Sequence, residues 1–211
     1  MNHVIIQKAR SHKYIKRLGA PGDYEYFYKQ PGRAKAESKA IMNKMDDLMK
    51  VFGQSEGMCG PASIRIALSA FGKSYSEEEV AHLAKSTAAY GTTHANMVNT
   101  VRTHGLHALT YQDLSKEHSL ELLKNYVNKG DPVIVDWLKT RDEQNEVEKY
   151  DLSDPENEHY CVVSKVDDSN INLLDPEAKK EISMPIAYFM ERWFTISERT
   201  NRWFLVLEKE K

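Results

Sequence analysis

Cysteine is scarce in this chain, and the scarcity excludes two kinds of fold. The 211 residues include two cysteines, Cys59 and Cys161, which are too few for a disulfide framework. They also lie too far apart for the C-x-x-C pair of a structural zinc site. Unpaired thiols fit a reducing compartment, so we expect a cytoplasmic protein with reduced cysteines.

Motifs for membrane insertion, export, metal hydrolysis and phosphate binding are also missing. No window approaches the roughly 18 consecutive apolar residues that a membrane span needs. The polar first 30 residues lack the pattern of a signal peptide. H-E-x-x-H and G-x-x-x-x-G-K are both absent. We therefore expect no membrane association, no metal and no cofactor.

The charged residues are unevenly distributed, although the net charge is only −2. Residues 1–40 contain nine Lys and Arg against three Asp and Glu, whereas residues 139–158 contain eight Asp and Glu against three Lys and Arg. The charge of both segments is explained if each is a solvated part of the surface. A sharper hypothesis is that the acidic segment attracts basic substrates or docks the basic N-terminal arm. The whole-chain charge gives no support for nucleic-acid binding, which we do not expect.

The length and the 41% hydrophobic content suit one globular domain with an appendage. We predict a basic N-terminal arm and the start of a helix over residues 1–44, followed by a domain over 45–211. Predicted helices come first along the chain and predicted strands follow. This order favours an α+β fold in which a helical half packs against an antiparallel sheet.

Local patterns predict the individual elements. Ser76 and Glu79 form a capping box for one helix, and Thr93 can cap another. Hydrophobic spacing and end signals predict helices over 34–51, 61–71, 77–85, 94–104, 115–129 and 185–194. Apolar runs predict strands over 106–111, 131–138, 158–167, 170–176 and 201–210.

The segment QSEGMCGPAS, residues 54–63, places Cys59 at the start of a predicted helix. A thiol attacks an amide only as a thiolate, and a helix N-terminus or a neighbouring imidazolium lowers the pKa of a thiol. Pro61 suits the first helical turn, and we expect Gly60 to leave room for a substrate backbone. Cys59 is therefore a candidate nucleophile. The alternative is an inert, buried thiol.

A nucleophilic cysteine needs a base, an orienting group and an oxyanion donor. His159 opens an apolar strand, and Asp175 ends the following one, so antiparallel pairing can bring them side by side. The side-chain amide of Gln54 and the backbone N–H of Cys59 could bind the oxyanion. The alternatives are a satisfied strand histidine, a turn-forming Asp-Pro and an exposed loop amide.

Four further residues have plainer explanations. Cys161 would share a strand face with His159, but we expect it to fill the core. We also expect Trp137 to pack in the core, with shielding of the His–Asp pair as the alternative. The polar surroundings of His94 and His104 favour positions on helix surfaces.

Five segments of the chain in combination suggest a family. The motif Q-x-x-x-x-C-G-P-A-S is followed by GTTHANMV, PVIVDW, HYCVVSKVDDSNINLLDPE and PIAYFMERW. Over roughly residues 50–208 this pattern resembles papain-fold cysteine peptidases of the bacteriocin-processing, double-glycine leader type, in particular stand-alone members without the transporter. The family usually has five residues between Gln and Cys, whereas this chain has four.

The resemblance implies that Cys59 is the nucleophile, His159 the base, Asp175 the orienting group and Gln54 the oxyanion donor. It implies hydrolysis of a peptide or isopeptide amide in a peptide or protein substrate, without a cofactor. Alternatives are an acyl transferase that uses the same site, and a non-catalytic binding module that keeps the fold.

The N-terminal segment HKYIKRLGAPGDYEYFYK is weakly similar to basic-aromatic segments of phage and mobile-element proteins. This suggests the cytoplasm of a bacterial or phage-infected cell. The segment could also be a pro-segment that the protein cleaves itself, although LGAPGD lacks a double glycine.

Overall fold

Five α-helices and eight strands are defined in the computed structural model, which describes residues 49–139 and 153–209. The predicted arm, most of the predicted helix over 34–51 and most of the acidic segment lie outside the described residues. The helices are α3 (Cys59–Ser69), α4 (Glu77–Ala84), α5 (His94–Thr103), α6 (Lys116–Lys129) and α7 (Ile186–Arg192), with a short 3-10 helix η1 (Pro155–Asn157).

Side chains cap the helices where the sequence predicted caps. The Ser76 hydroxyl accepts a hydrogen bond from the Glu79 N–H at the start of α4, and the Glu79 carboxylate accepts one from the Ser76 N–H. The Thr93 hydroxyl accepts one from the Asn96 N–H at the start of α5. Beyond α6, Gly130 has a φ of 83°, a left-handed conformation that glycine adopts without strain.

Six strands form one antiparallel sheet in the order β1-β8-β2-β3-β4-β5. They are β1 (Leu106–Tyr111), β2 (Val133–Leu138), β3 (Glu158–Val166), β4 (Asn170–Asp175), β5 (Lys180–Pro185) and β8 (Phe204–Lys209). The hairpin of β6 (Phe194–Thr195) and β7 (Thr200–Asn201) forms a separate two-stranded sheet. The α+β prediction is confirmed, but β5, β6 and β7 were not predicted.

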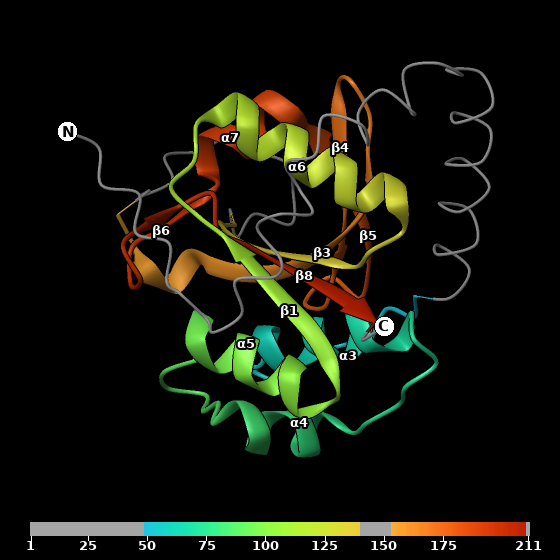
Figure 1. The fold of residues 1–211 in the computed structure, drawn as a ribbon. Coiled ribbons are helices and arrows are strands. Elements are labelled where there is room, and N and C mark those ends of the chain that lie inside the picture. The colour runs from blue at the N-terminus through green and yellow to red at the C-terminus, as the bar shows by residue number, and fades with distance from the viewer. Residues whose placement is uncertain (1–48, 140–152, 210–211) are drawn as a thin grey trace, which may run out of the picture. The chain divides into compact units, whose positions relative to one another are not determined.

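Helices cover both faces of the sheet (Figure 1). The α3, α4 and α5 helices lie on one side of it, and α6 and α7 lie on the other. Alternation along the central strand β2 supplies both faces, since Ile134 packs with the first group and its neighbours Val133 and Val135 with the second. Trp137 is buried in the second cluster, as predicted.

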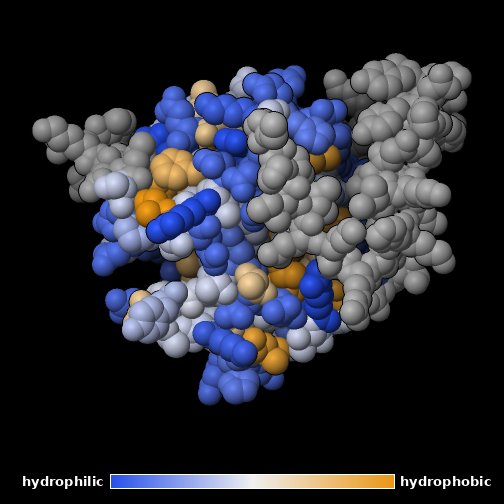
Figure 2. Space-filling model, turned by 60° about the vertical axis from the view of Figure 1, so that its left-hand side comes forward, coloured by the Kyte–Doolittle hydropathy of each residue, from blue (hydrophilic) through white to orange (hydrophobic). Residues whose placement is uncertain are grey.

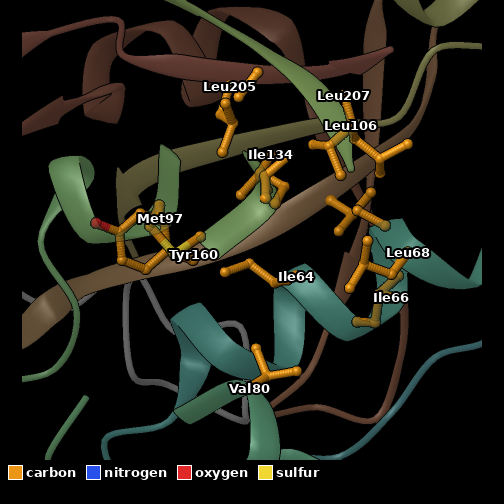
Figure 3. Close-up of a cluster of buried hydrophobic side chains, with 14 of the residues drawn as sticks. Ile64, Ile66, Leu68, Val80, Met97, Leu106, Ile134, Tyr160, Leu205 and Leu207 are labelled. Carbon is orange, nitrogen blue, oxygen red and sulfur yellow. The ribbon is translucent and has the colours of Figure 1, made fainter. Parts of the chain in front are cut away.

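The first cluster fixes α3, which carries Cys59 at its start. Figure 3 shows Ile64 of α3 directed toward the sheet, where Ile134 and Leu205 lie, and Val80 of α4 packed on the other side of α3. Nine of the 11 residues of α3 are buried, so the helix has little freedom to move. The Ser63 hydroxyl also donates to the Tyr160 carbonyl oxygen at 2.9 Å, which joins α3 to β3.

The outer surface is largely polar. Hydrophilic side chains dominate the face in Figure 2, and the apolar ones form separate patches. The large apolar side chains exposed in the described part of the chain are Leu83 and Tyr90. Within residues 49–139 and 153–209, no helix has the length and apolar character needed to cross a bilayer.

Candidate active site

Cys59 is the first residue of α3, and its side chain is half-buried. Helical hydrogen bonding begins with the bond from the Ala62 N–H to the Met58 carbonyl oxygen. The N–H groups of Cys59 and Gly60 therefore precede the bonded turns and contribute to the positive end of the helix dipole. Cys59 therefore lies at the positive end of the helix.

Gly60 is needed for packing rather than for substrate access. A Cβ atom at this position would lie 2.6 Å from the Thr92 Oγ1 and 2.8 Å from the Thr92 Cβ. The space left by the missing side chain is therefore filled by Thr92. The expectation that Gly60 leaves room for a substrate backbone is wrong for this reason.

His159 and Asp175 lie side by side in the adjacent strands β3 and β4. The His159 Nε2 is 2.9 Å from the Asp175 Oδ1. Both residues are buried, with exposed fractions of 5% and 0%. Asp175 Oδ1 also accepts hydrogen bonds from the N–H groups of Glu177 at 2.8 Å and Ala178 at 3.1 Å. The turn after β4 therefore fixes the carboxylate that orients the imidazole.

Because Asp175 contacts the Nε2 of His159, the other imidazole nitrogen is Nδ1. Burial alone would lower the pKa of His159. The negative charge that Cys161 carries when ionised acts in the opposite direction, as do hydrogen bonds to Asp175, Cys161 and Cys59, and together they raise this pKa well above its ordinary value. The imidazole is therefore stabilised as imidazolium, the form that can partner a thiolate.

Cys161 is the second thiol beside His159. It is fully buried in the core, as predicted, and burial raises its pKa. The Cys161 thiol therefore gives up its proton less readily than an exposed thiol does. Cys59 differs from it by lying half-exposed at a helix N-terminus.

Lys139, which the sequence did not single out, is the second charged partner of Asp175. Its Nζ lies 2.8 Å from the Asp175 Oδ2 and 2.6 Å from the Glu177 Oε2. Burial alone would raise the pKa of Asp175, but His159 and Lys139 outweigh it and hold this pKa well below its usual range. Asp175 is therefore ionised throughout the neutral range.

Gln54 lies on the loop before α3, and backbone contacts hold this loop at two points. The Gln54 N–H donates to the Pro176 carbonyl oxygen at 3.1 Å, next to Asp175. The Ser55 N–H donates to the Glu77 carboxylate at 2.9 and 3.2 Å. The loop is thus fixed between the β4 turn and α4, with Gln54 half-buried.

The structure also contains a second buried His–Asp pair, which corrects the prediction for His94. His94 Nε2 is 2.9 Å from Asp136 Oδ2, and the imidazole stacks on Trp203 with 3.9 Å between ring centroids. His94 is 7% exposed and Asp136 is 2% exposed. His94 is therefore a core residue that joins α5 to β2 and not a surface residue.

His104 is buried as well, against prediction. Its ring lies 4.2 Å from the ring of Tyr75, centroid to centroid. Burial lowers the pKa of His104. The residue is thus a neutral packing partner at the end of α5.

Three side chains of the kinds that bind metals cluster at this site, within the described residues. His159, Cys161 and Asp175 place three ligand-type atoms within 4.8 Å of one another. Both Asp175 oxygens already face other groups, namely His159 with two backbone N–H groups on one side and Lys139 on the other. Both Asp175 oxygens therefore have partners without a metal ion.

The arrangement of a cysteine at a helix N-terminus beside a buried His–Asp pair is that of a papain-like cysteine peptidase site. Residues 40–201 match the Peptidase_C39 like family, and the chain belongs to this family. The resemblance to bacteriocin-processing peptidases is thereby confirmed. None of the curated proteins matches the chain.

Solved structures show the same fold. The peptidase domain of Streptococcus ComA, a bi-functional ABC transporter, is 20% identical with a TM-score of 0.57, over 77% of this chain and 99% of that one. A C39-like peptidase from Bacillus anthracis is 17% identical with a TM-score of 0.58, over 78% and 96%. A double glycine motif protease from an AMS/PCAT transporter, in complex with the leader peptide, is 18% identical with a TM-score of 0.51, over 76% and 91%.

Proposed function

We propose that this protein is a cysteine peptidase that hydrolyses a peptide or isopeptide amide through a thioacyl-enzyme. The observation that carries the proposal is the 2.9 Å contact between the His159 Nε2 and the Asp175 Oδ1. This contact leaves the other imidazole nitrogen, Nδ1, for Cys59. Cys59 is the nucleophile, His159 the acid and base, and Asp175 the orienting group. Gln54 completes the site as an oxyanion donor.

The first half of the reaction forms the thioester. The Cys59 sulfur attacks the carbonyl carbon of the substrate, and negative charge develops on the carbonyl oxygen. The backbone N–H of Cys59 and the side-chain amide of Gln54 stabilise this charge. His159, as imidazolium, gives its proton to the amine, which leaves as the carbon–nitrogen bond breaks.

The second half releases the acid and restores the site. Neutral His159 takes a proton from water while the water oxygen attacks the thioester carbon. The carbon–sulfur bond breaks, the carboxylic acid product leaves, and the Cys59 thiolate again faces protonated His159. Only protein groups and water take part in these steps.

The substrate class we propose is a peptide segment, preferentially with basic residues. A related structure holds a leader peptide, which supports a peptide as the substrate. The acidic segment begins at Lys139 and ends at Glu158, so its two ends adjoin Asp175 and His159. Negative charge at this position favours basic peptides, more strongly at low ionic strength.

The first test is alkylation of the full chain with iodoacetamide across pH, followed by peptide mapping. We expect Cys59 to react faster than Cys161 and faster than an ordinary thiol near neutral pH. His159→Ala should abolish the excess rate, whereas the exposed His118→Ala should not change it. Ordinary reactivity of Cys59 that His159→Ala leaves unchanged would falsify the peptidase proposal.

The substrate is then sought in a peptide library that contains double-glycine leader-type peptides, each with basic and neutral flanking residues. We expect cleavage that requires Cys59 and a preference for basic flanks that weakens with salt. Hydroxylamine gives the hydroxamate from any thioacyl-enzyme, so the ratio of acid to hydroxamate at a fixed hydroxylamine concentration measures the preference for water over an amine acceptor. Equal cleavage of basic and neutral peptides at low salt contradicts the proposed charge preference.

A further inference from the structure

Lys139 occupies a constrained position next to the His–Asp pair. It directly follows β2, and its N–H donates to the Asn157 carbonyl oxygen at 2.7 Å, which fixes the backbone. The Lys139 side chain is 16% exposed and ends between the Asp175 Oδ2 at 2.8 Å and the Glu177 Oε2 at 2.6 Å. A lysine that loses this much solvent and side-chain freedom is strongly held by its partners.

The two oxygens of Asp175 have different partners. Oδ1 faces His159 at 2.9 Å, and Oδ2 faces Lys139 at 2.8 Å. A buried carboxylate with no other cation nearby would hold the imidazolium proton tightly. An ammonium group on the second oxygen offsets the negative charge, so the Lys139–Asp175 pair acts on His159 more like a neutral acceptor.

We propose that Lys139 is a positioning residue that tunes the His159 proton, because it neutralises Asp175 on the side opposite the imidazole. This inference rests on the proposed peptidase function, in which His159 must both hold and release that proton. Lys139 acts through Asp175 and does not touch the reacting atoms.

Other charged or titratable groups also act on His159. Cys59 approaches it from α3, and Cys161 lies on the same strand. Glu177, in the turn after β4, contributes a negative charge to the surroundings. The Glu177 side chain is 50% exposed and therefore largely screened by water. Lys139 is thus the buried cation whose removal most changes the electrostatic balance at the His159 proton.

The chain offers a matched lysine for comparison. Lys124 pairs with Asp168 at 3.4 Å, and the Asp168 side chain is fully exposed. Exposed pairs of this kind contribute little because water screens them. The same substitution at Lys124 therefore removes a lysine charge and an ion pair without changing the candidate site.

The test measures the His159 titration by NMR in the full chain, with isotope-labelled histidine and Cys59→Ala in every sample. Lys139→Met should raise the midpoint of the His159 titration by about one pH unit, because the attraction of Asp175 is no longer offset. Lys139→Arg keeps the charge and should keep the midpoint at the parent value. Lys124→Met should leave the midpoint unchanged.

Lys139→Gln is a second variant, in case Lys139→Met does not fold. Its amide can still donate to the Asp175 Oδ2, while the charge is lost. It should raise the midpoint as Lys139→Met does. A folded Met or Gln variant with the parent midpoint overturns the inference and assigns Lys139 a purely structural role. The peptidase proposal is judged separately, by the dependence of Cys59 alkylation on His159.

Activity gives a second readout with Cys59 intact. The alkaline limb of kcat/KM reports loss of the His159 proton. This limb should move to higher pH in Lys139→Met by the same amount as the NMR midpoint. A uniform loss of rate with an unmoved limb contradicts the inference.

Discussion

At the scale of single residues, two buried aspartates with the same kind of partner behave in opposite ways. Asp175 faces His159, Lys139 and two backbone N–H groups, and its pKa is held well below the usual range. Asp136 faces His94 and the Tyr160 side chain. Burial raises the pKa of Asp136. The number of positive and donor groups thus decides how each carboxyl titrates.

His94→Phe should expose this difference as a loss of stability. The phenyl ring can keep the stacking on Trp203, but Asp136 loses its hydrogen-bonding partner, the His94 Nε2, while it stays buried. We expect a loss of about 3 kcal/mol in the free energy of unfolding. The loss should grow from pH 5 to pH 8, because a carboxyl with a raised folded pKa binds more protons when folded than when unfolded.

Urea unfolding at pH 5 and pH 8 measures this effect. His118→Phe is the control, because the His118 side chain is 56% exposed on α6 and its ion pair with Glu121 is long, at 4.0 Å. An equal loss for His94→Phe at both pH values contradicts the assignment to Asp136.

The residues that lie on motifs could be predicted, whereas those defined by distant pairing could not. Cys59 is marked by the Gly-Pro that follows it, and His159 and Asp175 by their positions at the ends of successive apolar strands. Lys139 opens an acidic segment and resembles a solvated residue, until folding brings Asp175 to it. The burial of His94 depends on Trp203, from the far end of the chain. Polarity in the local sequence cannot reveal such partners.

At the scale of elements, α4 supports the loop that carries Gln54. The Glu77 carboxylate in the first turn of α4 accepts two contacts from the Ser55 N–H. The other anchor of the loop is the Pro176 carbonyl oxygen. This loop is also the stretch where the chain is one residue shorter than the family pattern, and its two anchors stabilise the shortened path.

Glu77→Ala should therefore weaken hydrolysis without weakening alkylation. Loss of one anchor lets Gln54 move away from the oxyanion, and removal of an oxyanion donor altogether costs about 100-fold in kcat. We expect a loss of about tenfold for Glu77→Ala, and a larger one for Gln54→Ala. Iodoacetamide forms no oxyanion, so the alkylation rate of Cys59 should stay at the parent value.

Cleavage of the best library peptide and iodoacetamide alkylation are measured in parallel. Ser76→Ala is the matched control, since it removes the cap of the same helix and costs about 1 kcal/mol of stability. A similar fall in kcat for Ser76→Ala would mean that α4 stability, and not the Glu77 anchor, controls the site.

Element prediction succeeded where one local rule sufficed. Capping side chains marked the starts of α4 and α5, and apolar runs marked the buried strands β2, β3, β4 and β8. Strand β5 was missed because its residues are exposed or half-buried: among the described strands it stands at the end of the sheet, beside β4. The two-residue strands β6 and β7 are too short to show a period.

At the scale of the whole molecule, the site lies where the two covered faces of the sheet meet. Cys59 packs against the cluster formed with α3, α4 and α5. The opposite cluster contains Cys161 and Trp137. Trp137 pairs with His159 across the β2–β3 ladder. Contact between Cys59 and His159 therefore requires both layers to be in place at once, so folding and site assembly are coupled.

This coupling predicts how stability depends on pH. Asp175 has a lowered folded pKa, so its contribution is present above about pH 4 and is lost as the pH falls further. His159 has a raised folded pKa, so its contribution is present below about pH 6.5 and is lost as the pH rises through the folded value. The pair should stabilise the folded protein most between these limits, by about 2 kcal/mol.

Urea unfolding from pH 3 to pH 9 tests this prediction. The difference in the free energy of unfolding between the parent and His159→Gln should be largest in that interval and should narrow on both sides of it. His118→Gln should not differ from the parent. A difference that is constant over the whole range would mean that packing, and not charge, holds the pair.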